Sequence, residues 1–296
     1  MGIRLGTNPI AWSNDDWREL GADISLDSCL SQARAAGFEG IELGHKFPRT
    51  SAQLRPLMDR HSIELIGGWY STELLRRSVA EEMQAAQDHM ALLEDMGCTI
   101  FIMAETSNAI HSDRAIGLSQ SPVLAAADWA EFGRRMTEFA ARLGDRGLVP
   151  AYHHHMGTVV ETSEEIARFM EATDEGVGLL LDTGHAAFAG ADPSVLARAY
   201  ASRITHVHCK DIRLPVRKAA LHSDASFLDA VIEGVFTVPG DGGVDFPSVL
   251  AEMGKAAYGG WLVVEAEQDP EKADPETYAN LGFTNLQSFA ADAGLK

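Results

Sequence analysis

The stretch Val177-Gly-Leu-Leu-Leu-Asp182-Thr-Gly-His185 sets the plan of the whole chain. Its aliphatic run is typical of a strand that is buried on both faces, and it ends abruptly in an acid, a short turn and a histidine. Three other segments repeat this design, at residues 151–155, 204–211 and 261–267. Four buried strands that end in metal-competent side chains predict one shared site at the carboxyl ends of a parallel sheet.

Strand-like and helix-like segments alternate along all 296 residues. Eight strands are predicted, each followed by a helical pattern or a loop, at residues 3–12, 38–44, 63–70, 99–105, 148–155, 177–182, 204–211 and 261–267. No linker or low-complexity stretch divides them. Repeated strand–helix units of this kind predict an α/β protein with a single (β/α)8 barrel, a TIM barrel, as one domain over residues 1–296.

Local signals predict several helix boundaries. Ser121 as N-cap and Pro122 at the first helical position predict a helix over residues 122–143. The run Thr162-Ser-Glu-Glu165 has the spacing of a capping box and predicts the start of another helix. Residues 73–96 are predicted to form one long amphipathic helix.

Two segments are too long or too irregular to be simple connections. Residues 107–121 show no clear period, and residues 213–238 exceed the usual length of a strand–helix loop. Both are expected to lie over the mouth of the barrel.

Composition excludes several classes of partner. The chain has 24 basic and 43 acidic residues, a formal net charge of −19, which argues against nucleic acid and anionic membranes because both attract clustered Lys and Arg. No run approaches the ~20 apolar residues of a membrane span. The three cysteines show no paired framework or CxxC spacing, which fits a reducing compartment. We therefore expect a cytoplasmic protein with a small-molecule substrate, in a fold that often forms homo-oligomers.

Asp182, His208 and Glu265 are the best candidates for metal ligands. Each ends a buried run, where an unpaired charge would be costly without a counter-ion. Mixed imidazole and carboxylate ligands suit a divalent ion such as Mn, Co, Zn or Mg, and the lack of thiolates argues against a structural zinc site. The alternatives are a turn cap for Asp182, a core histidine for His208 and a salt bridge from Glu265 to Lys210.

The fourth ligand is less certain from the sequence. Strand alternation places His153 and His155 on one face and His154 on the other. His153 is the favoured ligand, with His155 near the substrate. Glu105 or His155 could take the ligand position instead, and the histidine run could also be a polar network without metal contact.

Three further residues at the strand ends carry candidate roles. His185 follows Asp182 in the turn and is expected to bind substrate or a metal-bound water. His206 shares a strand face with His208 and could orient it. Lys210 could act as a base if burial lowers its pKa, or as a counter-charge for neighbouring carboxylates.

These residues resemble the xylose-isomerase-like TIM barrels. Asp182-Thr-Gly-His185, His206-Val-His208 and Glu265 match that superfamily's motifs on strands six, seven and eight, whereas His153 stands where an acid usually ends strand five. Within the superfamily, the chain is similar to the inosose (2-keto-myo-inositol) dehydratases over nearly its whole length. The most specific runs are Tyr152-His-His-His-Met-Gly-Thr158 and Glu265-Ala-Glu-Gln-Asp-Pro270.

The resemblance implies a hydro-lyase of inositol catabolism. Such an enzyme removes water from scyllo-inosose to give a trihydroxycyclohexane-dione, with Mn or Co as the metal that stabilises the enolate. Glutathione has also been associated with these enzymes, and nothing in this sequence speaks for or against it. The implied roles are base for Glu265 or Lys210, acid for His155 or His185, and substrate binding for Trp12, Trp69, Glu42 and Glu267.

Three other functions compete with this interpretation. A sugar or inosose isomerase or 3-epimerase of the same superfamily shares the enolate step and returns the proton instead of losing water. A DNA-repair endonuclease would need additional metal ligands and a basic groove, which the charge of −19 opposes. A non-catalytic sugar-binding barrel would have the fold without turnover.

Overall fold

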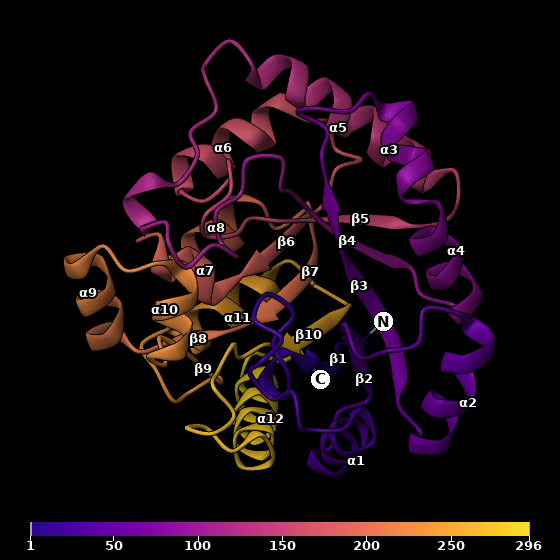
Figure 1. Ribbon diagram of the computed structural model, residues 1–296, viewed down its shortest axis with the longest axis vertical. Coiled ribbons are helices and arrows are strands. Elements are labelled where there is room, and N and C mark those ends of the chain that lie inside the picture. The colour runs from indigo at the N-terminus through magenta and orange to yellow at the C-terminus, as the bar shows by residue number, and fades with distance from the viewer. Residues whose placement is uncertain (1, 296) are drawn as a thin grey trace.

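The computed structural model describes residues 2–295, and its centre is a closed barrel of eight parallel strands (Figure 1). The order around the barrel is β1-β10-β7-β6-β5-β4-β3-β2, and β1 closes the ring by pairing with β10. The predicted TIM barrel is therefore confirmed. The barrel strands are β1 (Arg4–Thr7), β2 (Gly40–Leu43), β3 (Glu64–Thr72), β4 (Ile100–Glu105), β5 (Val149–His153), β6 (Leu179–Asp182), β7 (Ile204–Cys209) and β10 (Trp261–Val264).

Helices surround the strands on the outside of the barrel (Figure 1). They are α1 (Leu26–Ala36), α2 (Ser51–His61), α3 (Val79–Ala85), α4 (Gln87–Met96), α5 (Trp129–Gly144), α6 (Ser163–Ala172), α7 (Thr183–Phe188), α8 (Pro193–Ala199), α11 (Phe246–Lys255) and α12 (Pro275–Asp292). Short 3-10 turns, η1 (Pro9–Ala11) and η2 (Leu118–Gln120), lie in the loops after β1 and β4.

Strand alternation decides which side chains point inward. On β6, Leu179 and Leu181 belong to the large core between strands and helices, while Leu180 packs inside the barrel with Ile102 and Ala151. Asp182, two residues beyond Leu180, therefore shares its inward face. The ends of β5, β6 and β7 in this way deliver His153, Asp182 and His208 to one central region.

Two predicted helix boundaries are wrong. The helix expected to start at Pro122 begins at Trp129, because the Ser121 hydroxyl donates to Leu118 O and to Glu161 instead of capping a helix. The helix expected over residues 73–96 is two helices, α3 and α4, since Ser78 starts α3 with its own capping box and Ala86 interrupts the run.

The long segment after β7 builds a small second layer over the barrel mouth. It contains a two-stranded antiparallel pair, β8 (Asp211–Ile212) and β9 (Phe236–Thr237), and the helices α9 (Leu214–Ser223) and α10 (Phe227–Ile232). Their apolar side chains form a second hydrophobic core, which includes Met156 and Phe188. The prediction of an excursion at this place is confirmed.

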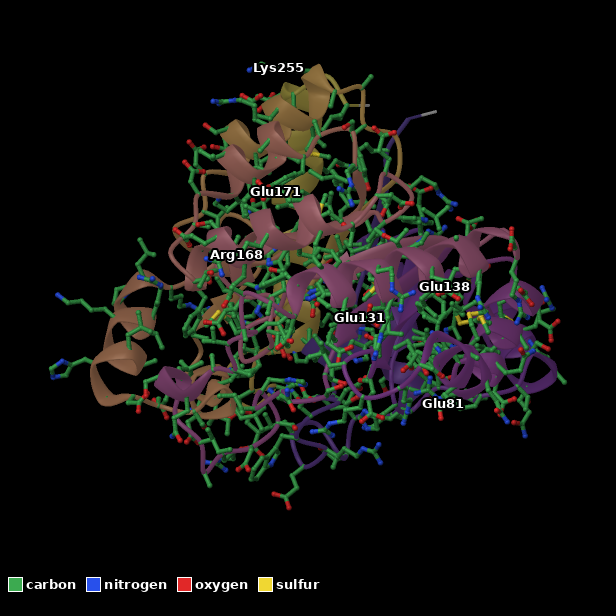
Figure 2. All side chains as sticks on the ribbon, turned by 90° about the horizontal axis from the view of Figure 1, so that it is seen from above. Glu81, Glu131, Glu138, Arg168, Glu171 and Lys255 are labelled. Atoms are coloured by element: carbon green, nitrogen blue, oxygen red, sulfur yellow. The ribbon has the colours of Figure 1, made fainter. Side chains whose placement is uncertain are left out.

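The outer helix faces are rich in ion pairs. Glu131 and Glu138, seven residues apart on α5, point outward from the helix (Figure 2). Arg134 lies within ion-pair distance of both, 2.8 Å from Glu131 and 3.4 Å from Glu138. Within residues 2–295, no helix combines the length and the apolar character that crossing a bilayer requires.

Candidate active site

Four of the predicted site residues converge at the carboxyl ends of neighbouring strands. His153 ends β5, Asp182 ends β6, His208 lies near the end of β7, and Glu265 follows β10. Each offers one ligand atom, and these atoms all lie within 4.8 Å of one another. The Asp182 Oδ2 atom is 3.4 Å from His153 Nε2 and 3.6 Å from His208 Nδ1, and His208 Nδ1 also contacts Glu265 Oε2.

The donor atoms of this cluster fit a divalent cation. Asp182 Oδ2, His208 Nδ1 and Glu265 Oε2 are buried and make no hydrogen bond. Buried polar atoms without a partner are costly, and two carboxylates held this close repel each other. A divalent ion bound by two imidazoles and two carboxylates would satisfy all of these atoms at once.

The alternative fourth ligands are occupied elsewhere. The Glu105 carboxylate accepts hydrogen bonds from the backbone N–H groups of Leu74 and Ser107, at 2.7 and 2.9 Å. His155, the other alternative, gives no atom to this cluster and groups instead with His185 and Glu267. The geometry therefore favours His153 over Glu105 and His155. His154 lies just beyond β5, and its Nε2 accepts a hydrogen bond of 3.2 Å from the Asp182 N–H.

Asp182 combines two of the roles considered for it. Its Oδ1 accepts a hydrogen bond of 2.8 Å from the His185 N–H and so caps α7. Its Oδ2 is left free to face the cluster. The cap therefore fixes the orientation of the carboxylate.

Glu42 and His206 hold His208 in place. Glu42 Oε1 lies 3.0 Å from His208 Nε2 and 2.7 Å from His206 Nε2, and Glu42 Oε2 accepts a hydrogen bond of 2.7 Å from Asn8. Burial raises the pKa of Glu42, but His208 and His206 outweigh burial and lower it. Glu42, expected to bind substrate, has its carboxylate occupied by these contacts, and it turns His208 Nδ1 toward the cluster.

Lys210 forms a buried charge network behind the cavity wall. Its Nζ lies 2.7 Å from Glu267 Oε2, 3.0 Å from His185 Nε2 and 3.4 Å from Glu265 Oε1. Burial lowers the pKa of Lys210, but the neighbouring carboxylates outweigh burial and raise it. A role as base needs a lowered pKa, so this geometry favours the counter-charge. Gly184 permits the arrangement, since a Cβ there would lie 2.4 Å from Lys210 Cγ.

A cavity with an empty volume of about 580 Å³, including the space at its mouth, opens above the cluster. Of the predicted residues, its lining includes Trp69, Glu42, His153, His155, His208, Glu265 and Glu267. Lys210 and His185 do not belong to the lining.

Trp12 does not lie where the sequence interpretation placed it. Its side chain is 1% exposed, packs in the main hydrophobic core and donates a hydrogen bond of 2.6 Å from Nε1 to Gln32. The reason is that the chain leaves β1 through the 3-10 turn η1, which rotates Trp12 away from the barrel axis. The expectation that Trp12 binds substrate is corrected accordingly.

Sequence reasoning missed three titratable residues of the cavity lining. Asp15 and Asp16 come from the loop after β1, and His111 comes from the loop after β4. The loop after β4 was expected over the site, but strand alternation gives no information about which loop side chains point down. The polar run Ser13-Asn-Asp-Asp16 directly after the first strand was the available signal.

Comparison with known proteins agrees with the fold and the site. Residues 30–287 match the family of xylose isomerase-like TIM barrels, and the chain belongs to that family. Over 296 residues it is 50% identical to the rhizopine catabolism protein MocC of Rhizobium meliloti, covering 100% of this chain and 91% of that protein. Over 279 residues it is 42% identical to inosose dehydratase 2 of Bacillus cereus, covering 94% of each.

The solved structures agree on the architecture. A xylose isomerase domain protein from Alicyclobacillus acidocaldarius superposes with a TM-score of 0.69 at 18% identity, over 99% of each chain. The resemblance to the inosose dehydratases that the sequence motifs indicated is confirmed.

Proposed function

We propose that this protein is a metal-dependent hydro-lyase that removes water from scyllo-inosose or a close inosose relative. The relatives named inosose dehydratase, at 38–42% identity over most of the chain, support the reaction class. The single observation that supports the metal dependence is the buried cluster of His153, Asp182, His208 and Glu265. Mn or Co is the metal we propose, because imidazole and carboxylate donors suit these ions.

The reaction needs a more acidic C–H bond beside the ketone and two proton transfers, one from that carbon and one to the departing hydroxyl. A divalent ion held by His153, Asp182, His208 and Glu265 would polarise the ketone and so acidify the neighbouring C–H. The C–H electron pair then forms the C=C bond of an enol, the β C–O bond breaks, and the departing hydroxyl takes up a proton and leaves as water. Ketonisation of the enol gives the dione.

His155 is the residue that we propose for proton transfer. Its Nδ1 lies 2.7 Å from Met156 O, a carbonyl that only accepts, so Nδ1 carries the proton and Nε2 is left with a free lone pair. The residue lines the cavity, so this lone pair is available to take the α-proton. Once protonated, the ring can donate that proton to the departing hydroxyl.

The expected alternatives to His155 are less well placed. Glu265 gives Oε2 to the ligand cluster, and its Oε1 lies 3.4 Å from Lys210. His185 lies behind the wall, with its Nε2 directed to Lys210 at 3.0 Å. In this proposal, Lys210 and His185 are positioning residues. Lys210 contacts Glu267 and Glu265 and so holds both carboxylates in place.

The test is product analysis with metal-loaded protein. Incubation with scyllo-inosose is expected to give a dione that is lighter by one water and absorbs in the ultraviolet. A product of unchanged mass would identify an isomerase or epimerase instead. Asp182→Ala and His208→Ala should lose bound metal and turnover together, and full metal content in both variants would refute the proposed site.

A further inference from the structure

The cavity has a second polar wall, made of residues outside the metal cluster. This wall, which we call the roof, is formed by residues 14–17 after β1 and residues 106–114 after β4. Asp15, Asp16 and His111 are its cavity-lining polar residues. His111 Nε2 lies 3.7 Å from Asp16 Oδ1, whereas Asp15 Oδ1 is already paired with His45 Nδ1 at 2.7 Å. The strand ends that carry the cluster belong to β5–β7 and β10, so the two walls come from different parts of the barrel.

Side-chain contacts fix the roof over the cavity. The Asn14 side chain accepts hydrogen bonds from the backbone N–H groups of Asp16 and Trp17, at 2.8 and 2.7 Å. The guanidinium of Arg114 lies 4.3 Å from the centre of the Trp17 ring and also donates to Asp229 of α10 at 2.7 Å. The two loops and the second layer are therefore tied together, and the roof is preformed.

His111 has an unused polar atom at this wall. The residue is 9% exposed, and its Nδ1 is buried without a hydrogen-bond partner. Its ring centre lies 5.0 Å from that of His155 and 6.4 Å from that of Trp69. A buried ring nitrogen without a partner, beside the proposed proton-transfer residue, points to a ligand hydroxyl as the missing partner.

The charge of the cavity restricts what the roof can bind. Among the described residues that line it there is no lysine or arginine, whereas Asp15 and Asp16 contribute carboxylates on the roof. Carboxylates accept hydrogen bonds from hydroxyl groups and repel phosphate or carboxylate substituents. The roof therefore suits the hydroxyl groups of an uncharged ring.

We propose that Asp16 and His111 form a specificity-determining pair that binds the ring hydroxyls farthest from the reacting ketone and rejects anionic ring polyols. This assignment rests on the proposed function, in which the ketone end of the ring faces the metal cluster. Trp69, between the two walls, packs against the C–H face of the same ring.

The experiment compares Asp16→Asn and His111→Asn with wild type, each loaded with manganese. The loss of one charge-assisted hydrogen bond should raise KM for scyllo-inosose about tenfold and change kcat little. Calorimetric binding of myo-inositol should weaken by a similar factor. Quinate is a polyhydroxylated cyclohexane carboxylate. Its affinity relative to that of myo-inositol should be higher in Asp16→Asn than in wild type, because the negative charge that repels its carboxylate is gone.

Asp23→Asn is the matched control, since it makes the same change at an exposed position of the same loop. Unchanged KM, myo-inositol affinity and quinate preference in both roof variants, with normal metal content, would overturn the assignment and leave the proposed function intact. If wild type binds myo-inositol and the variants weaken it, but no form turns over inosose, Asp16 and His111 still bind ring hydroxyls and the proposed function fails. Absence of both binding and turnover in wild type would overturn both.

Discussion

At the scale of single residues, the Asp182 side chain has two separate roles, one in stability and one in metal binding. One carboxylate oxygen caps α7 and the other faces the cluster. Asp182→Asn keeps an oxygen for the cap and loses the charge, while Asp182→Ala loses both. Manganese content measured by mass spectrometry should fall in both variants, but only Asp182→Ala should also lose about 1 kcal/mol of stability from the missing cap. Equal loss of stability in the two variants would contradict this division of roles.

A variant of His155 distinguishes a role in proton transfer from a role in metal binding. If its Nε2 transfers the proton, His155→Gln should lower kcat by about 10²–10⁴-fold and leave the metal content unchanged. His222→Gln, the same change at an exposed position, is the control. A His155→Gln variant that keeps its kcat would remove His155 from the mechanism.

His89 gives a pH dependence that does not involve the active site. Burial lowers its pKa to about 4, although the hydrogen bond to Gly68 O opposes this. The ordinary value is about 6.5, so between pH 6.5 and 4 the unfolded chain binds a proton that the folded chain does not. His89 therefore reduces stability as pH falls through that window, and between pH 7 and pH 5 the loss is roughly 2 kcal/mol.

His89→Gln keeps a side-chain N–H for Gly68 and cannot titrate. Chemical denaturation at pH 7 and pH 5 should show a smaller loss of stability for this variant than for wild type. His222→Gln, at an exposed position, is the control. The same loss in wild type and His89→Gln would contradict the assignment.

At the scale of elements, the capping box of α6 tests how local sequence signals act. Thr162 Oγ1 accepts from the Glu165 N–H at 3.3 Å, and Glu165 Oε2 accepts from the Thr162 N–H at 2.9 Å. Thr162→Ala should cost about 1 kcal/mol in the free energy of unfolding, measured by urea denaturation. Ser163→Ala, one residue on and outside the box, should change it by less than half as much.

The elements also show what could be predicted from the sequence. Strand alternation was sufficient to place His153 and Asp182 inward, because both lie within strands and side chains there alternate between two faces. It does not account for His154 and His155, since β5 ends at His153. Helix starts were predictable where the cap is local, as at Thr162, and wrong where a distant partner intervened. Ser121 is the example, because Glu161, forty residues away, takes its hydroxyl.

The rest of the site depended on information that the sequence does not contain locally. Trp12 and Asp16 lie four residues apart in one loop, yet only Asp16 reaches the cavity, since η1 sets the direction of the chain. The pKa of Lys210 could not be predicted in direction, because burial and the neighbouring carboxylates oppose each other and only the distances decide. The hydrogen bonds of Glu42 with His206 and His208 could not be predicted either, because they join strands far apart in sequence.

At the scale of the whole molecule, a bound ion would connect four strands of the barrel. A ligand that binds only the folded state adds about 2.7 kcal/mol of stability at a concentration one hundred times its Kd. Manganese should therefore raise the Tm of the metal-free wild type in calorimetry, and a chelator should reverse the shift. His208→Ala should show no such shift, and an equal shift in that variant would indicate binding elsewhere.

The most direct measurement is an anomalous-scattering map from a crystal grown with manganese. We expect one strong peak within bonding distance of His153, Asp182, His208 and Glu265. A map without a peak there, or with the ion bound by other side chains, would contradict the central claim that these four residues hold the catalytic metal.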